Sequence, residues 1–183
     1  MVLFFMKKRL FIAIDLPIKV KRKTSRLIKK LSVAHPDIKW EVKDKLHLTL
    51  KFLGTTEVLP EKIMITLHKK LVDQKPFTME FLELGTFVGK STAVFLEIRK
   101  NEELLRTYFK VENAMRDLKF AKERHKFYPH LTLGRSKLPI SDMVPLKHNL
   151  PAVTVSSVVL YQSQLTKTGS IYTNLGQVDF NLG

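Results

Sequence analysis

Two identical tetrapeptides contain the residues of this chain that are best suited to chemistry. His47-Leu48-Thr49-Leu50 lies in the first half of the chain and His130-Leu131-Thr132-Leu133 in the second. Successive side chains of an extended strand alternate between its two faces. Each copy is therefore predicted to be a half-buried strand, with an imidazole and a hydroxyl on one face and two leucines on the other.

Two imidazoles that face each other suit an in-line displacement at phosphorus, in which the attacking and leaving oxygens lie on opposite sides. One neutral histidine would take a proton from water, and one protonated histidine would give a proton to the leaving oxygen. The ordinary imidazole pKa of about 6.5 makes both forms accessible near neutral pH. The hydroxyls of Thr49 and Thr132 would donate to the other phosphoryl oxygens.

A cation follows each tetrapeptide. Lys51 comes directly after the first copy, and Arg135 comes one glycine after the second. Strict alternation predicts that Lys51 shares the face of His47. The direction of Arg135 depends on the bend at Gly134.

Neither a metal nor a cysteine enters the predicted chemistry. The chain has no cysteine, which excludes disulfides, thiolate catalysis and Cys-based zinc sites. No group of His, Asp and Glu has the spacing of metal ligands, so we expect no metal and no cofactor. The other histidines lack a polar-strand context and are interpreted as surface or loop residues: His35, His68, His125 and His148.

The elements around each tetrapeptide repeat as well. A strand over residues 10–16 and a helix over residues 18–33 precede the first histidine strand, residues 46–53. A strand over residues 92–98 and a helix capped by Asn101 and ending near residue 118 precede the second, residues 130–134. This repeat, roughly 9–54 and 92–135, predicts an α+β fold. We expect one bilobal domain of two pseudo-symmetric lobes, each an antiparallel sheet with helices packed outside, and an active-site cleft between them.

The rest of the chain is predicted to form shorter elements. We expect a strand over residues 38–42, a turn at 43–45, a helix over 60–72, and a strand over 77–88 that a turn at 89–90 connects to residue 92. Residues 121–128 form a basic loop, and residues 139–148 are irregular or a short helix. Strands over 153–161 and 171–180 flank a turn at 167–169. Residues 1–7 would be a disordered extension, with Met6 as an alternative start.

The net charge of +15 and a pI near 10 are extreme for 183 residues. They favour a polyanionic partner, with nucleic acid ahead of a membrane surface. The helix over residues 18–33 contributes much of this charge. No stretch approaches the length of a membrane span, and the N-terminus lacks the apolar run of a signal peptide. We therefore expect a cytoplasmic protein.

The extended motifs resemble those of the two-histidine (2H) phosphoesterase superfamily, and most closely its LigT-like branch of RNA 2′,3′-cyclic phosphodiesterases, first described as 2′-5′ RNA ligases. The resemblance rests on residues 9–17, on Ile38-Lys39-Trp40 with residues 46–54, and on residues 128–135. Residues 85–87 and 165–172 also resemble family positions. The family often has a proline where this chain has Val88.

This resemblance implies hydrolysis of a terminal 2′,3′-cyclic phosphate of RNA, tRNA fragments included, to a 2′-phosphomonoester, without a metal. It implies that His47 is the proton donor and His130 the proton acceptor, and that Thr49 and Thr132 bind the phosphate. Lys51 and Arg135 would be further substrate contacts. The aromatic residues that would stack on a base are Phe11, Phe52 and Tyr172. No protein partner is implied, and a monomer is expected.

Three alternatives stay open at the level of the sequence. The same histidines would catalyse the reverse reaction in a 2′-5′ RNA ligase. The basic helix would also suit an RNA-binding module without turnover, although such a module has no use for paired His and Thr in both halves. A small cyclic nucleotide or an ADP-ribose cyclic phosphate is a third option, against which the charge favours a longer polyanion.

Overall fold

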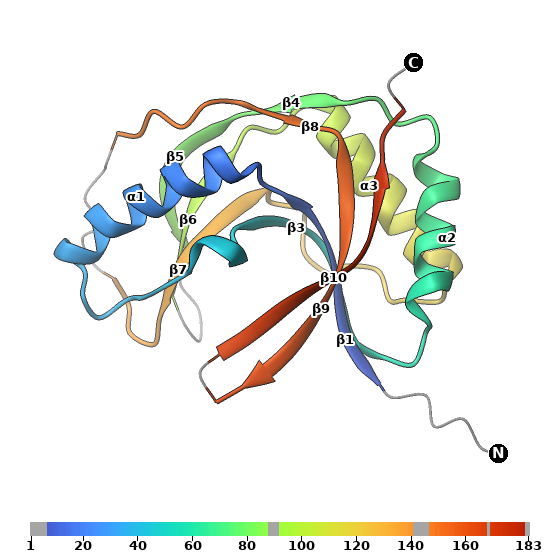
Figure 1. Cartoon of the computed structure of the whole chain (residues 1–183), viewed down its shortest axis with the longest axis horizontal. Coiled ribbons are helices and arrows are strands. Elements are labelled where there is room, and N and C mark those ends of the chain that lie inside the picture. The colour runs from blue at the N-terminus through green and yellow to red at the C-terminus, as the bar shows by residue number, and fades with distance from the viewer. Residues whose placement is uncertain (1–6, 88–91, 141–146, 168, 182–183) are drawn as a thin grey trace.

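A computed structural model describes residues 7–87, 92–140, 147–167 and 169–181, which fold as an α+β chain (Figure 1). In chain order the elements are β1 (Lys8–Asp15), α1 (Ile18–Ala34), β2 (Lys39–Trp40), the 3₁₀ turn η1 (Lys43–Lys45), β3 (His47–Thr56), α2 (Pro60–Leu71), β4 (Phe77–Met79), β5 (Phe81–Phe87), β6 (Thr92–Ile98), α3 (Glu102–Asp117), β7 (His130–Ser136), β8 (Val153–Val155), β9 (Ser157–Thr166) and β10 (Gly169–Asp179).

Eight of the described strands form one antiparallel sheet. Seven follow the order β10-β9-β1-β3-β7-β6-β5, and β2 pairs with β7. The strands β4 and β8 form a small second sheet. This architecture confirms the predicted α+β class with antiparallel pairing, and the two predicted sheets join edge to edge in one.

The junction lies between the two histidine strands. β3 and β7 are paired through Leu48 and Leu131, the second residue of each tetrapeptide. On either side β1 pairs with β3 and β6 pairs with β7. Equivalent residues therefore meet at the centre of the sheet, and an approximate two-fold axis passes between them.

The helices cover the sheet from two places (Figure 1). α2 and α3 lie side by side at one end, and α1 lies at the other end. Each helix buries one stripe of side chains at helical spacing. In α1 this stripe is Val20, Thr24, Leu27, Ile28 and Leu31. As predicted, Asn101 caps α3, because its side chain accepts the N–H of Leu104 at 2.8 Å.

The four leucines of the tetrapeptides are buried in the core, each at most 4% exposed, as alternation predicts. Their burial holds both histidine strands against the helices. The opposite face of each strand stays half-buried, and it carries His47, Thr49, His130 and Thr132.

Several predicted boundaries differ from those observed. β3 continues past Gly54 to Thr56, because its pairing with β1 continues through Gly54, whose φ is 69°, to the partner of Lys8. The predicted strand over 77–88 is divided at Glu80, where the chain passes from the small sheet to the large one. The strand over 153–161 is divided at Ser156 for the same reason. Only Lys39–Trp40 of the strand over 38–42 is paired.

Some predictions fall outside the described residues. They are the extension up to residue 6, the turn at 89–90, most of the segment 139–148, and residue 168 in the turn between β9 and β10.

Candidate active site

The two histidines are held in the same way. The Nδ1 of His47 lies 2.7 Å from the carbonyl oxygen of Lys45, and the Nδ1 of His130 lies 2.7 Å from that of Tyr128. A carbonyl oxygen only accepts, so Nδ1 carries the proton in both rings. The Nε2 atoms are therefore left for chemistry, each with its lone pair in the neutral ring.

A threonine hydroxyl lies next to the first of these nitrogens. The Oγ1 of Thr49 is 3.0 Å from the Nε2 of His47, and in the neutral ring the hydroxyl donates to it. Thr132 occupies the equivalent half-buried position beside His130. The structure therefore brings the two His-Thr pairs onto the same side of the sheet, on either side of the Leu48–Leu131 junction.

The register of each histidine strand shifts by one residue at the last leucine of its tetrapeptide. Leu50 is the extra residue in β3, opposite the step from Ile12 to Ala13 of β1. Leu133 is the extra residue in β7. Such a bulge reverses the alternation beyond it. The residue directly after the tetrapeptide then faces the core, and the next one faces the histidines.

The bulge makes the prediction for Lys51 wrong. Its side chain lies on the core face, 3% exposed, where Nζ contacts the Glu112 carboxylate of α3 at 2.6 Å. It also donates to the carbonyl oxygen of Ala121 at 3.0 Å. Lys51 therefore lies away from the face of His47, and the position equivalent to Arg135 is Phe52.

Arg135 and Phe52 lie on the histidine face and are exposed. Burial lowers the pKa of His130, and the positive charge of Arg135 lowers it further. The same charge opposes the rise that burial causes in the pKa of Tyr172. Phe52 is 60% exposed, and its ring centroid lies 6.1 Å from that of Phe11. One strand thus offers a cation beside the site, and the other offers a free aromatic face.

Aromatic rings surround both imidazoles. The ring centroid of His47 lies 4.9 Å from that of Phe11 and 5.5 Å from that of Tyr172. Phe11 is only 3% exposed, so it supports the imidazole from beneath and has no free face for a base. The prediction that Phe11 stacks on substrate is therefore wrong. Tyr172 is half-buried and keeps part of its ring accessible.

The second imidazole has its own aromatic support. The centroid of His130 lies 5.1 Å from that of Phe87 and 5.4 Å from that of Phe95. The sequence prediction did not include Phe95 among the site residues. Its position in the strand before the second tetrapeptide was the available signal.

A carboxylate stands opposite each histidine, which the sequence prediction also missed. Asp15 of β1 is the register partner of His47, and Glu97 of β6 is the register partner of His130. A tyrosine hydroxyl donates to each carboxylate: Tyr161 to Asp15 and Tyr128 to Glu97. The signal was present in the spacing, because the two acids precede their histidines by 32 and 33 residues at the ends of otherwise apolar strands.

The two carboxylates differ in their cations. Lys21 of α1, a buried residue, lies with Nζ 2.6 Å from the Asp15 carboxylate. Among the described residues no ion pair of Glu97 is present. The carboxylate opposite His47 is therefore ion-paired, and its charge still raises the pKa of His47 by more than the charge of Lys21 lowers it.

Burial lowers the pKa of His47 from 6.5 to about 4, and the charges of Lys21 and His130 add to this effect. The bond to the Lys45 carbonyl and the charge of Asp15 oppose it. The pKa of His130 is lowered as well. Both rings are thus mainly neutral at pH 7 in the free protein, and each is close enough to charged groups to respond to a bound anion.

The described residues include no group of three or more His, Asp or Glu arranged to hold a metal ion. Within the same part of the chain, no helix has the length and apolar character needed to cross a membrane. Of the remaining predicted surface histidines, His148 donates through Nε2 to the carbonyl oxygen of Leu82 and lies outside the site.

Comparison with protein families gives a match to the model of the 2′-5′ RNA ligase superfamily over residues 20–164. This match covers most of the chain and includes both tetrapeptides. The chain belongs to the 2′-5′ RNA ligase superfamily.

Relatives with assigned names resemble the chain over nearly its whole length. An RNA 2′,3′-cyclic phosphodiesterase of Methanocaldococcus jannaschii is 32% identical, over 90% of this chain and 96% of its own. An RNA 2′,3′-cyclic phosphodiesterase of Thermotoga maritima is 33% identical, over 96% of this chain and 97% of its own.

Two solved structures have the same fold. The protein TT0787 of Thermus thermophilus superposes with a TM-score of 0.82 and 26% identity, covering 94% of this chain and 97% of its own. LigT of E. coli, in complex with 3′-AMP, gives a TM-score of 0.79 at 24% identity, over 96% and 98% of the two chains. The fold described above is therefore shared with both solved proteins.

Proposed function

We propose that the protein hydrolyses the 2′,3′-cyclic phosphate at the end of an RNA and leaves a 2′-phosphomonoester. The observation that carries this proposal is the matched pair of imidazoles, both held through Nδ1 and both with Nε2 on the same face of the sheet. The names of the relatives, RNA 2′,3′-cyclic phosphodiesterases at 32% and 33% identity, support the same substrate.

The chemistry needs one proton taken and one proton given. We propose that the Nε2 of His130 accepts a proton from water while the water oxygen attacks phosphorus. The bond from phosphorus to O3′ breaks, and the Nε2 of His47 gives its proton to O3′. The 2′ oxygen keeps the phosphate, and the two protons balance once the histidines exchange with solvent.

The general acid must be protonated before the reaction, although burial favours the neutral ring of His47. A bound phosphodiester carries a negative charge, and such a charge beside an imidazole raises its pKa. We therefore propose that the substrate itself promotes protonation of His47. The adjacent Thr49 hydroxyl would then turn from Nε2 towards a phosphoryl oxygen, as Thr132 would on the other side.

Two exposed groups on the histidine face complete the proposed substrate site. Arg135 offers a guanidinium to the phosphate, and Phe52 offers an aromatic face for stacking a base. Tyr172 is the second candidate for stacking, since it lies beside His47.

The reverse reaction is the second candidate function, and the family to which the chain belongs is named for it. In ligation a 5′-hydroxyl of a second RNA would replace water as the nucleophile. Water is present at far higher concentration than any RNA end, and it needs no binding site of its own. Hydrolysis is therefore the favoured direction.

The experiment is to incubate the protein with an RNA that ends in a 2′,3′-cyclic phosphate, in the presence of EDTA, and to identify the product by ³¹P NMR. We expect a 2′-phosphomonoester from the wild type. A 3′-phosphate, or no product, would contradict the proposal, and a longer RNA with a 2′-5′ linkage would support ligation instead. Histidine variants at positions 47 and 130 are the matched negative controls.

A further inference from the structure

The exposed face of α1 carries positive charge that no acidic side chain balances. Over Ile18–Ala34 the chain has seven lysines and arginines and no Asp or Glu. One of them, Lys21, is buried against Asp15. The other six are exposed: Lys19, Arg22, Lys23, Arg26, Lys29 and Lys30. We call these six residues the α1 cations.

The α1 cations differ from those on the other helices. Lys70 of α2 pairs with Asp117, and Lys110 of α3 pairs with Asp73, both at 2.9 Å. Within the described part of the chain, no acidic group lies within ion-pair distance of any α1 cation. The charge of this face is therefore free to act on a partner.

The clustering of the α1 cations lowers the stability of the helix. Like charges three or four residues apart repel each other, as Lys19 and Lys23 do, or Arg22 and Arg26. The first turn also has no acidic residue to complement the helix dipole. A face that lowers the stability of its own helix is expected where an external polyanion compensates for it.

A groove beside the helix gives this partner a path. Lys23, Arg26 and Lys30 line it from α1, and Lys147 lines it from the opposite side together with His148. Its volume of about 270 Å³ is below the range of roughly 300–1,000 Å³ that small-molecule pockets occupy. The groove suits the sugar–phosphate backbone of a strand passing through better than a whole enclosed ligand.

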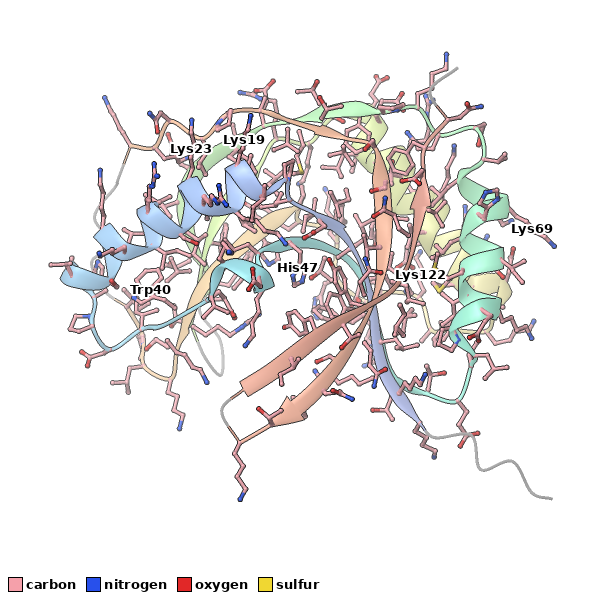
Figure 2. The ribbon with its side chains drawn as sticks, in the orientation of Figure 1. Lys19, Lys23, Trp40, His47, Lys69 and Lys122 are labelled. Atoms are coloured by element: carbon pink, nitrogen blue, oxygen red, sulfur yellow. The ribbon has the colours of Figure 1, made fainter. Side chains whose placement is uncertain are left out.

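The helix also connects this surface to the candidate active site. α1 begins three residues after Asp15, the register partner of His47, and Lys21 of its first turns holds that carboxylate. In Figure 2, Lys19 and Lys23 project from the helix on the side turned away from His47, whereas Lys69 lies on α2 at the other end of the molecule. The helix therefore begins beside the site, and Lys19 and Lys23 lie on its face turned away from His47.

We propose that the α1 cations, with Lys147, bind the body of the single-stranded RNA whose cyclic phosphate end occupies the histidine site. This inference rests on the proposed function for the identity of the RNA end. A 17-residue helix is about 25 Å long, which matches about seven stacked nucleotides. The surface would give longer RNAs a lower KM without changing the chemical step.

The test compares a dinucleotide with a 20-nucleotide RNA, both ending in a 2′,3′-cyclic phosphate. The variant is Lys23→Gln/Arg26→Gln/Lys30→Gln. The matched control, Lys62→Gln/Lys69→Gln/Lys75→Gln, removes the same charge from exposed lysines on and just after α2. In the wild type we expect kcat/KM to be at least tenfold higher for the long RNA.

In the α1 variant this preference should disappear through KM, with the dinucleotide turned over as by the wild type. The control should keep the preference. The salt slope of binding should fall by about 0.7 for each phosphate that the variant no longer neutralises. An equal loss of the preference for the long RNA in both triple variants would overturn the proposal, and so would an unchanged preference in the α1 variant. Loss of binding to anionic vesicles without loss of RNA binding would also overturn it.

Failure of the proposed function would look different. If the wild type hydrolyses neither RNA, the reaction assignment fails, and the α1 surface is then judged by the Kd for the 20-nucleotide RNA alone. A weaker Kd in the α1 variant than in the control would still support the surface, and equal Kd values would overturn it.

Discussion

At the scale of single residues, the site contains the same arrangement of side chains twice. Each imidazole donates through Nδ1 to the carbonyl two residues earlier, and each has a carboxylate opposite it on the neighbouring strand. The copies differ in their ion pairs, because Lys21 pairs with Asp15 and Glu97 has no such partner among the described residues. This difference gives two chemically equal rings different electrostatic environments.

The ion pair opposite His47 gives a first prediction. Burial is the main cause of the low pKa of His47 and stays in place, but we expect Lys21→Met to raise this pKa above about 4, because it removes a positive charge and leaves Asp15 uncompensated. The measurement is an NMR titration of the imidazole. Lys19→Met, an exposed neighbour on the same helix, is the control and should leave this pKa unchanged.

The same pKa makes stability depend on pH. The unfolded chain takes up a proton at His47 near pH 6.5, whereas the folded protein does so only near pH 4. The His47 contribution to the free energy of unfolding is therefore complete above pH 6.5, and it decreases as pH falls from 6.5 towards 4. From pH 7.5 to pH 4.5 we expect the free energy of unfolding to fall by about 2 kcal/mol through His47 alone.

Urea unfolding of the wild type and of His47→Asn at both pH values checks this expectation. The wild type should lose more stability than the variant over this interval. An equal loss in the two proteins would show that the folded His47 titrates at its ordinary pKa.

At the scale of elements, the bulges at Leu50 and Leu133 decide which residues reach the site. They turn Lys51 and Gly134 towards the core, and Phe52 and Arg135 towards the histidines. Lys51 then takes part in the packing of α3, through a pair with Glu112 that is almost completely buried.

The pair of Lys51 and Glu112 is expected to matter for stability and not for binding. Lys51→Met leaves a buried carboxylate unpaired, which costs about 3–5 kcal/mol, and the double variant Lys51→Met/Glu112→Leu should recover most of this loss. The measurements are urea unfolding and the kcat/KM of the folded protein. A large loss of kcat/KM in the stable double variant would instead indicate that Lys51 contributes to substrate binding.

Much of the arrangement of strands and helices could be predicted from the sequence. Alternation placed the leucines of both tetrapeptides in the core and the His-Thr pairs outside, and the strand–helix–strand spacing indicated the repeat. Alternation failed for Lys51, because a one-residue bulge leaves no mark in the pattern of polar and apolar residues. It also gave no sign that Phe11 is covered, since burial of an aromatic ring depends on strands distant in the sequence, here β9 and β10.

At the scale of the whole molecule, the two-fold arrangement and the charge serve different purposes. The edge-to-edge pairing of β3 and β7 brings two equivalent histidine strands together at one point. The α1 cations break this symmetry, because the equivalent helix α3 begins with Glu102 and Glu103. The symmetric histidine strands suit the reaction. The α1 cations, which break this symmetry, suit the binding of a polyanion in one direction.

We propose that His47 gives a proton and His130 takes one at the same phosphate, and a change of leaving group separates these two roles. The substrates are an RNA 2′,3′-cyclic phosphate and a nucleotide 4-nitrophenyl phosphodiester, whose leaving group departs without protonation. We measure kcat/KM for the wild type, His47→Ala and His130→Ala on both. His47→Ala should lose about 10²–10⁴-fold on the RNA and less than tenfold on the nitrophenyl ester, whereas His130→Ala should lose heavily on both. Equal losses for the two variants on both substrates, or no loss in either variant, would contradict these roles of His47 and His130.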